Sequence, residues 1–319
     1  MKTIELTPRE RLNGRLAELL WDSWVALGVA GQPSARAVPY VLDPEALLLA
    51  TLRFGSVEPR LAGEVADWLA GCGEILSLQR LRNLQTGCKI APADALAGLG
   101  GFMEGAGFPH WKALRGDAMA RLFVSEGFKA RGLARQPDPR EPAAFLARLR
   151  RLFGVNARPE VLAWLLTHRS GHPAGIARET GWFSKSVQAI LIDLEAGGFV
   201  TSEMRGKRRE FSLNPRDRTL HPELGTALAW QTQGMLWTAF VHLDAMLGEL
   251  ETSAGRSAGA RAVAVRSRLA PLRAALNQAG AADPFAGLAE EQGEELVTGF
   301  LAGVESMRQA VERRVFGNP

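Results

Sequence analysis

The sequence predicts a mainly α-helical protein that carries one small β-hairpin. Three observations support this fold class. Apolar residues recur at helical spacing through most of the 319 residues, strand-like segments are confined to residues 199–213, and glycine or proline separates the apolar stretches. A chain of this length can bury the cores of two or three domains.

Composition and helix spacing divide the chain into four predicted parts. Residues 129–142 are rich in proline, arginine and aspartate and have no apolar face, which is typical of a linker or surface loop. The parts are a helical domain at 1–128, this linker at 129–142, a central unit at 143–221 that starts with a helix over 143–153, and a C-terminal helical region at 222–319.

Helix-start signals recur in the N-terminal part. Asp43, an N-cap, and Glu58 each precede a proline, and Ser77 begins a further helix. We expect helices over 8–27, 44–54, 58–69, 77–85, 92–99 and 111–123. The helix after Ser77 presents Arg80, Arg82 and Asn83, which we interpret as the polar face of a bundle helix, with contact to phosphates as the alternative.

The C-terminal part predicts three long helices, from Pro222 to about Leu250, over 259–279 and over 288–315. Apolar stripes run along the first and the last of them. Such stripes most often pack within one chain. A dimer interface is the second interpretation, and the sequence does not separate the two.

The most specific signal lies in residues 174–213. A short helix, Pro173–Thr180, is followed by Gly181 at a turn and by a longer helix, Ser184–Ala196, for which Ser184 is a suitable N-cap. Gly197 and Gly198 end the second helix. The residues expected where the two helices face each other and the core are Ile176, Ala177, Trp182, Val187, Ile190 and Leu191. This order, followed by a hairpin, is that of a helix-turn-helix with a wing.

The opposite face of the second helix carries Ser184, Lys185, Ser186 and Gln188. Glutamine can pair with adenine through two hydrogen bonds, lysine can reach guanine or a phosphate, and serine can do either. The helix dipole adds attraction for phosphate at this end. We therefore predict that these four residues bind DNA.

The predicted hairpin has a basic tip. Arg205, Lys207, Arg208 and Arg209 place four positive side chains in five residues around Gly206. Most isolated charge runs are solvated loops, but this run directly follows a helix-turn-helix pattern. Because like charges repel one another unless an anion faces them, we predict that these four residues also bind DNA.

The distribution of charge supports this prediction. Residues 143–221 hold 13 lysines and arginines against 7 acidic residues, whereas residues 1–142 hold 17 against 16 and residues 222–319 hold 8 against 11. The positive excess therefore lies in the central unit, which is typical of a nucleic-acid-binding segment.

Residues 158–213 resemble the winged helix-turn-helix domain of bacterial transcription regulators of the ArsR and MarR types. The matching features are the helix Arg158–His168, the helices Pro173–Thr180 and Ser184–Ala196, and the hairpin. The resemblance implies DNA binding through the second of these two helices and the wing, usually as a dimer. The metal-binding cysteines of many arsenic-type repressors have no counterpart here.

No catalytic, metal or cofactor set emerges elsewhere. The glycine-rich segment 98–107 lacks a preceding strand, and His168 and His172 flank a turn. Cys72 and Cys88 fit thiols of a reducing compartment, with a redox switch as a minor alternative. The sequence shows neither a signal peptide nor a membrane-spanning run, so we expect a cytoplasmic protein.

The sequence thus predicts a sequence-specific DNA-binding transcription regulator and not an enzyme. Its expected partners are double-stranded DNA and a second copy of the chain, and its helical flanks leave room for a small-molecule effector. Two alternatives remain, a winged-helix scaffold for protein interactions and an RNA-binding, antitoxin-like regulator.

Overall fold

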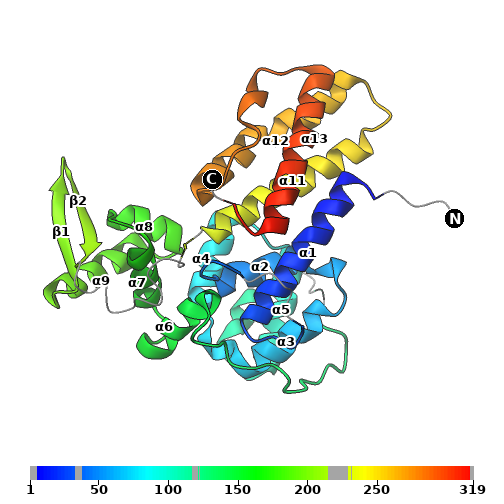
Figure 1. Cartoon of the computed structure of the whole chain (residues 1–319). Coiled ribbons are helices and arrows are strands. Elements are labelled where there is room, and N and C mark those ends of the chain that lie inside the picture. Colours follow the sequence, from blue (N-terminus) through cyan, green and yellow to red (C-terminus); the bar gives the residue numbers. More distant parts are fainter. Residues whose placement is uncertain are drawn as a thin grey trace.

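A computed structural model describes residues 6–32, 38–116, 121, 123–214, 229–230 and 232–316. These residues form a mainly helical protein with one antiparallel hairpin, so the predicted fold class is confirmed at this level (Figure 1). The helices are Pro8–Ala26 (α1), Pro44–Phe54 (α2), Leu61–Cys72 (α3), Leu78–Cys88 (α4), Ala93–Gly105 (α5), Phe145–Phe153 (α6), Ala157–Thr167 (α7), Pro173–Thr180 (α8), Ser184–Ala196 (α9), Gln233–Thr252 (α11), Ala258–Ala279 (α12) and Gly293–Arg313 (α13). The strands are Val200–Arg205 (β1) and Arg208–Leu213 (β2).

Local capping explains where several helices begin. The Thr7 hydroxyl accepts the N–H of Glu10, and the Glu10 carboxylate accepts the N–H of Thr7, which forms a capping box before α1. Asp43 caps α2 and Ser77 caps α4, in both cases by accepting a backbone N–H of the first turn. The predicted starts of these helices are confirmed.

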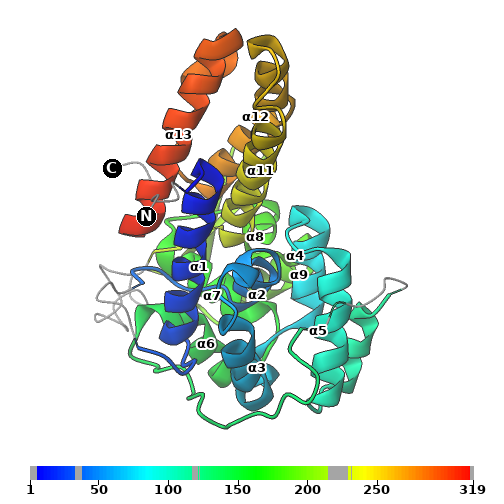
Figure 2. The same ribbon diagram turned by 90° about the vertical axis from the view of Figure 1, so that its right-hand side faces the viewer.

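Helices from the two ends of the chain share one hydrophobic core. The core joins α1–α5 to α11–α13, with α1 packed on α13 and α11 on α12 (Figures 1 and 2). We call these eight helices the helical body. Leu236, Phe240 and Leu243 of α11 and Phe300 and Val304 of α13 are buried in this core. The apolar stripes of the C-terminal part therefore pack within the chain.

Two predicted helices differ from the structure. The helix expected from Pro222 starts at Gln233, since Ala229, Trp230 and Thr232 are not helical; Pro222 itself lies outside the described residues. The helix expected over 111–123 is a short 3-10 helix, Pro109–Leu114. Among the described residues, no helix combines the length and apolar character needed to cross a membrane.

The glycine-rich segment 98–107 belongs mostly to α5, where its glycines permit close packing. A side chain at Gly98 would clash with the carbonyl oxygen of Arg121, and one at Gly100 would lie 3.0 Å from the carbonyl oxygen of Trp111. These glycines therefore let the chain after α5 fold back onto the helix.

The segment 129–142, expected as a linker or loop, runs along the helical body. The Asp67 carboxylate accepts the backbone N–H groups of four consecutive residues, 131–134. The N–H of Arg135 donates to the carbonyl of Gly28 at 2.8 Å. The segment leads into α6, which packs on α7 as the sequence predicts.

Helices α7–α9 and the hairpin form a separate cluster with its own core, which we call the 157–213 unit. The core includes Val161, Ile176, Val187, Leu191 and Phe211. Gly171, between α7 and α8, pairs with Phe211 through two backbone hydrogen bonds of 2.9 Å. The unit lies beside the helical body, and the hairpin forms its outer end (Figure 1).

Candidate nucleic-acid interface

Helices α8 and α9 pack around a glycine turn. Gly181 has φ +73°, a left-handed conformation that glycine adopts without steric cost. Ile176, Val187 and Leu191 are fully buried between the helices, and Trp182 and Ile190 are partly buried. The predicted facing positions are therefore confirmed, and this packing fixes which side of α9 remains exposed.

The start of α9 differs from the prediction in one respect. Ser184 is the first helical residue, and the N-cap position is taken by Phe183, whose backbone is extended (φ −71°, ψ 137°). A phenylalanine side chain cannot accept a hydrogen bond, so no side chain caps this helix. The first backbone N–H groups of α9 therefore have no acceptor within the helix and can donate to an acceptor outside it.

The predicted base-contacting residues lie together on the exposed side of α9. Ser184, Lys185, Ser186 and Gln188 are all exposed within the first two turns. Sequence reasoning missed Arg178, which is exposed on α8 and has no ion-pair partner within the described ranges. The helical spacing could have indicated this residue: Arg178 follows Ala174 by four residues and so lies on the same exposed face of α8.

The hairpin has a two-residue turn at its tip. Strands β1 and β2 pair over six positions, from Val200 opposite Leu213 to Arg205 opposite Arg208, and Gly206 in the turn has φ +64°. In the part of the chain that the structure describes, Lys207 and Arg208 have no side-chain hydrogen bond or ion pair. These two charges are free to meet an anion.

The other two arginines of the hairpin are already paired. Arg205 lies 2.6 Å from Glu203 and 3.5 Å from Glu210. Arg209 lies 2.6 Å from Glu195 of α9 and also covers the ring of Phe211, with 5.0 Å from its guanidinium carbon to the ring centre. A hydrogen bond from Ser202, together with the Arg209 charge, lowers the pKa of Glu195. Arg209 therefore fastens the hairpin to α9.

A buried cluster of charges, which we call the junction cluster, joins the 157–213 unit to the helical body. Its members are Asp43, Glu45, Arg80, Arg150 and Glu160, with side chains at most 6% exposed. The sequence suggested that Arg80 lies on a solvated face of α4 or contacts phosphate. Both interpretations are wrong, because the Arg80 side chain is completely buried.

Arg80 connects both sides of the junction. Its guanidinium donates to Asp43 at 2.5 and 2.6 Å and to Glu45 at 2.7 Å, and its Nε donates to the carbonyl of Thr180 at 2.7 Å. Burial alone would raise the pKa of Asp43, but the charge and hydrogen bonds of Arg80 hold that pKa below its usual range. Asp43 is therefore an anion in the folded protein.

Arg150 completes the cluster from α6. It donates to Glu45 at 2.7 and 2.8 Å, to Glu160 of α7 at 2.5 and 3.0 Å, and to the carbonyl of Ile75 at 2.8 Å. Three carboxylates and two guanidinium groups thus share one buried site. Among the described residues, no group of three or more His, Cys, Asp or Glu side chains is placed to hold a metal ion.

Helix α4 also contacts the turn between α8 and α9 directly. The Asn83 side chain donates to the carbonyl of Gly181 at 3.1 Å. A side chain at Gly181 would meet Leu84 at 2.8 Å. Together with Arg80, these contacts hold the turn between α8 and α9 and so orient α9 relative to the helical body.

Large apolar side chains are also exposed on the 157–213 unit. Phe183, Ile192, Phe199 and Met204 are between 44% and 65% exposed. Ile192 follows Lys185 by seven residues on the same face of α9. If the partner were DNA, Ile192 could contact a thymine methyl group. If the partner were a protein, it would cover several of these side chains.

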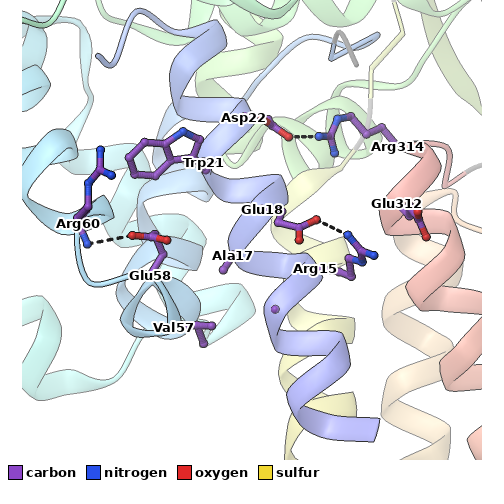
Figure 3. A pocket seen from close by; sticks show the side chains of 11 residues that line it. Arg15, Ala17, Glu18, Trp21, Asp22, Val57, Glu58, Arg60, Glu312 and Arg314 are labelled. Carbon is purple, nitrogen blue, oxygen red and sulfur yellow. Dashed lines mark hydrogen bonds and ion pairs between the residues drawn. The ribbon is translucent and has the colours of Figure 1, made fainter. Parts of the chain in front are cut away.

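An open groove of about 710 Å³ runs along α1 (Figure 3). Its charged side chains are engaged with one another: Arg15 lies 2.7 Å from Glu18, Asp22 pairs with Arg314, and Arg60 covers the ring of Trp21. The groove therefore offers a mixed surface of paired charges, without a group poised for chemistry.

The remaining residues noted in the sequence have local roles. The ring of His168 stacks on Trp164 at 4.0 Å, and His172 caps α8. Cys72 and Cys88 are free thiols; burial raises the pKa of Cys72 to about 11 and also raises that of Cys88. Both thiols are thereby kept protonated.

Comparison of the chain with family models, curated proteins and solved structures gave no match. The resemblance of residues 158–213 to the ArsR and MarR types remains a prediction from the residues themselves.

Proposed function

We propose that the chain is a sequence-specific DNA-binding transcription regulator whose 157–213 unit is a winged helix-turn-helix. The observation that carries the proposal is the exposed, uncapped start of α9, with Lys185 beside it, in the same unit as a hairpin tip whose Lys207 and Arg208 lack protein partners. In this proposal α9 enters the major groove and the hairpin lies along the phosphate backbone.

The contacts of the charged residues support a division of roles within the proposed interface. Ser184, Ser186 and Gln188 would read base edges, and Lys185, Lys207 and Arg208 would neutralise phosphates. Arg205 and Arg209 are paired with carboxylates, so they would shape the hairpin more than they would add free charge. Arg178 on α8 is a further phosphate contact in this proposal.

A protein-interaction scaffold is a second candidate, favoured by the exposed Phe183, Ile192, Phe199 and Met204. An RNA-binding regulator would use the same free cations. Selection of bound fragments from a genomic duplex library, with structured RNA as competitor, separates the three. We expect the full-length chain to enrich discrete duplex sequences. Preferential capture of RNA, or enrichment of no duplex, would contradict the proposal.

A further inference from the structure

A cleft of about 560 Å³ lies where the 157–213 unit meets the helical body, and we call it the junction cleft. His168 and Glu179 line it from the unit, and Tyr40 lines it from the segment before α2. Trp230 lines it from the segment before α11, and Phe316 from the segment after α13. Its volume is in the range of small-molecule sites. A molecule bound there would touch both sides of the junction.

The side chain of Tyr40 is the most unusual feature of this cleft. It is 5% exposed and packs edge-on against Phe316, with ring centres 6.4 Å apart. Its hydroxyl has no hydrogen-bond partner in the described part of the chain. Burial raises the pKa of Tyr40, so the group stays a neutral donor. Because Tyr40 lines the cleft and its hydroxyl makes no hydrogen bond to the described residues, this hydroxyl can donate to a molecule in the cleft.

Trp230 supplies a second unsatisfied donor at the cleft. Its indole N–H is buried and has no acceptor among the described residues. The indole N–H can only donate, so a molecule that satisfies it must present a lone pair. The aromatic rings of Tyr40, Trp230 and Phe316 favour a flat, apolar molecule.

The charges at the cleft favour a neutral molecule. Glu179 already accepts a hydrogen bond of 2.7 Å from the indole of Trp164 and lies 3.8 Å from His168. Arg314, which also lines the cleft, is paired with Asp22. Both charged groups are already engaged, so a charged ligand would lose its hydration in the cleft without gaining an unpaired counter-charge.

We propose that the junction cleft binds an uncharged, ring-containing small molecule whose carbonyl oxygen or ring nitrogen accepts a hydrogen bond from Tyr40. Because such a ligand would contact α8 and the helical body together, its binding would be coupled to the placement of α9. The coupling rests on the proposed DNA-binding function, whereas the binding site itself does not.

The chain has a single tyrosine, so one resonance reports on the site. Full-length protein labelled with carbon-13 at the ζ position of tyrosine would be titrated with benzamide and acetophenone. We expect a saturable shift of that resonance. Benzoate and benzylamine, the charged analogues, should bind at least about fivefold more weakly, because each would bring a charge out of water into a cleft lined by aromatic rings.

Variants test whether the shift arises in the cleft. Ligand-observed NMR should show benzamide binding about fivefold weaker for Tyr40→Phe, which removes only the hydroxyl. Ala229→Trp should abolish binding, because Ala229 is exposed at the rim and a large ring there fills the cleft. Trp21→Phe, in the groove along α1, is the matched control and should bind as the wild type does.

Two results would overturn the site: no saturable shift with either neutral probe, or wild-type binding by Ala229→Trp. The coupling is tested separately by fluorescence anisotropy of a selected duplex with and without benzamide. Coupled sites must change each other's affinity by the same factor. Binding of both ligands without mutual effect would overturn the coupling, whereas binding of benzamide alone would contradict the proposed DNA binding and leave the cleft in place.

Discussion

Gly181 shows how much of the geometry of the turn between α8 and α9 depends on one residue. Its backbone is left-handed at φ +73°, and its missing side chain leaves room for Leu84 of α4. Any other residue would have to adopt a disfavoured backbone conformation and also displace a core leucine. Gly181 therefore serves both the turn and the contact with the helical body.

We expect Gly181→Ala to lower the free energy of unfolding by at least about 1–2 kcal/mol, the usual cost of a left-handed residue with a side chain. Urea denaturation of the full chain measures the change. Gly175→Ala is the matched control: this glycine is helical and has open space around it, so alanine should stabilise by about 0.5–1 kcal/mol. Equal stability of both variants would show that the turn is not strained as described.

Residue-level signals predicted many helix starts but not the partners of buried charges. Asp43 was expected to cap its helix and Ser77 to begin one, and both cap a backbone N–H only three residues away. Arg80 was misread because its partners Asp43 and Thr180 are 37 and 100 positions distant. Its burial depends on the packing of the 157–213 unit against α4, which no local sequence pattern indicates.

At the scale of elements, the hairpin combines free and paired charges within a few residues. Arg205 and Arg208 face each other across the strands, yet Arg205 is paired with Glu203 while Arg208 has no partner in the described part of the chain. The run of four basic residues was visible in the sequence. Its partial neutralisation was not, because that depends on strand register and on the position of Glu195.

We predict that Arg208→Ala lowers the slope of log affinity against log salt by about one, as expected for the loss of one phosphate contact. Arg205→Ala, in the opposite position of the same hairpin, should change the slope much less because its charge is already balanced. Fluorescence anisotropy with a duplex between about 50 and 200 mM salt measures both. A larger effect of Arg205→Ala would contradict this division of roles.

At the scale of the whole molecule, a unit encoded in the middle of the chain docks on a body made from both ends. The sequence predicted the elements of each, because their apolar periodicity is local. It did not predict that α1–α5 and α11–α13 share a core, or that the junction cluster fixes the docking. Those contacts are long-range and leave no periodic pattern.

Removing one cation from the junction cluster should strongly destabilise the protein. We expect Arg80→Met to cost about 3–5 kcal/mol, because it leaves buried carboxylates without their partner. Arg82→Met on the exposed side of the same helix is the control and should stay within about 0.5 kcal/mol of the wild type. Chemical denaturation monitors both, and a mild effect of Arg80→Met would show that the cluster does not hold the junction.

Acid should weaken the same junction. Asp43 has a folded-state pKa below the ordinary value of 3.8, so it contributes stability above that value that is lost as the pH falls through the folded pKa. We predict that the free energy of unfolding decreases below about pH 4. Asp43→Asn, which cannot titrate, should show a smaller decrease over this range. An identical pH profile for both proteins would argue against a charged Asp43.

The central claim is that α9 and the hairpin tip bind duplex DNA, and its most direct test is the affinity of the full-length chain for a selected duplex across salt. We predict binding that weakens steeply with salt, with a slope that falls by about three in the triple variant Lys185→Ala, Lys207→Ala, Arg208→Ala. Duplex binding that is undetectable, independent of salt, or unchanged in the triple variant would contradict the claim.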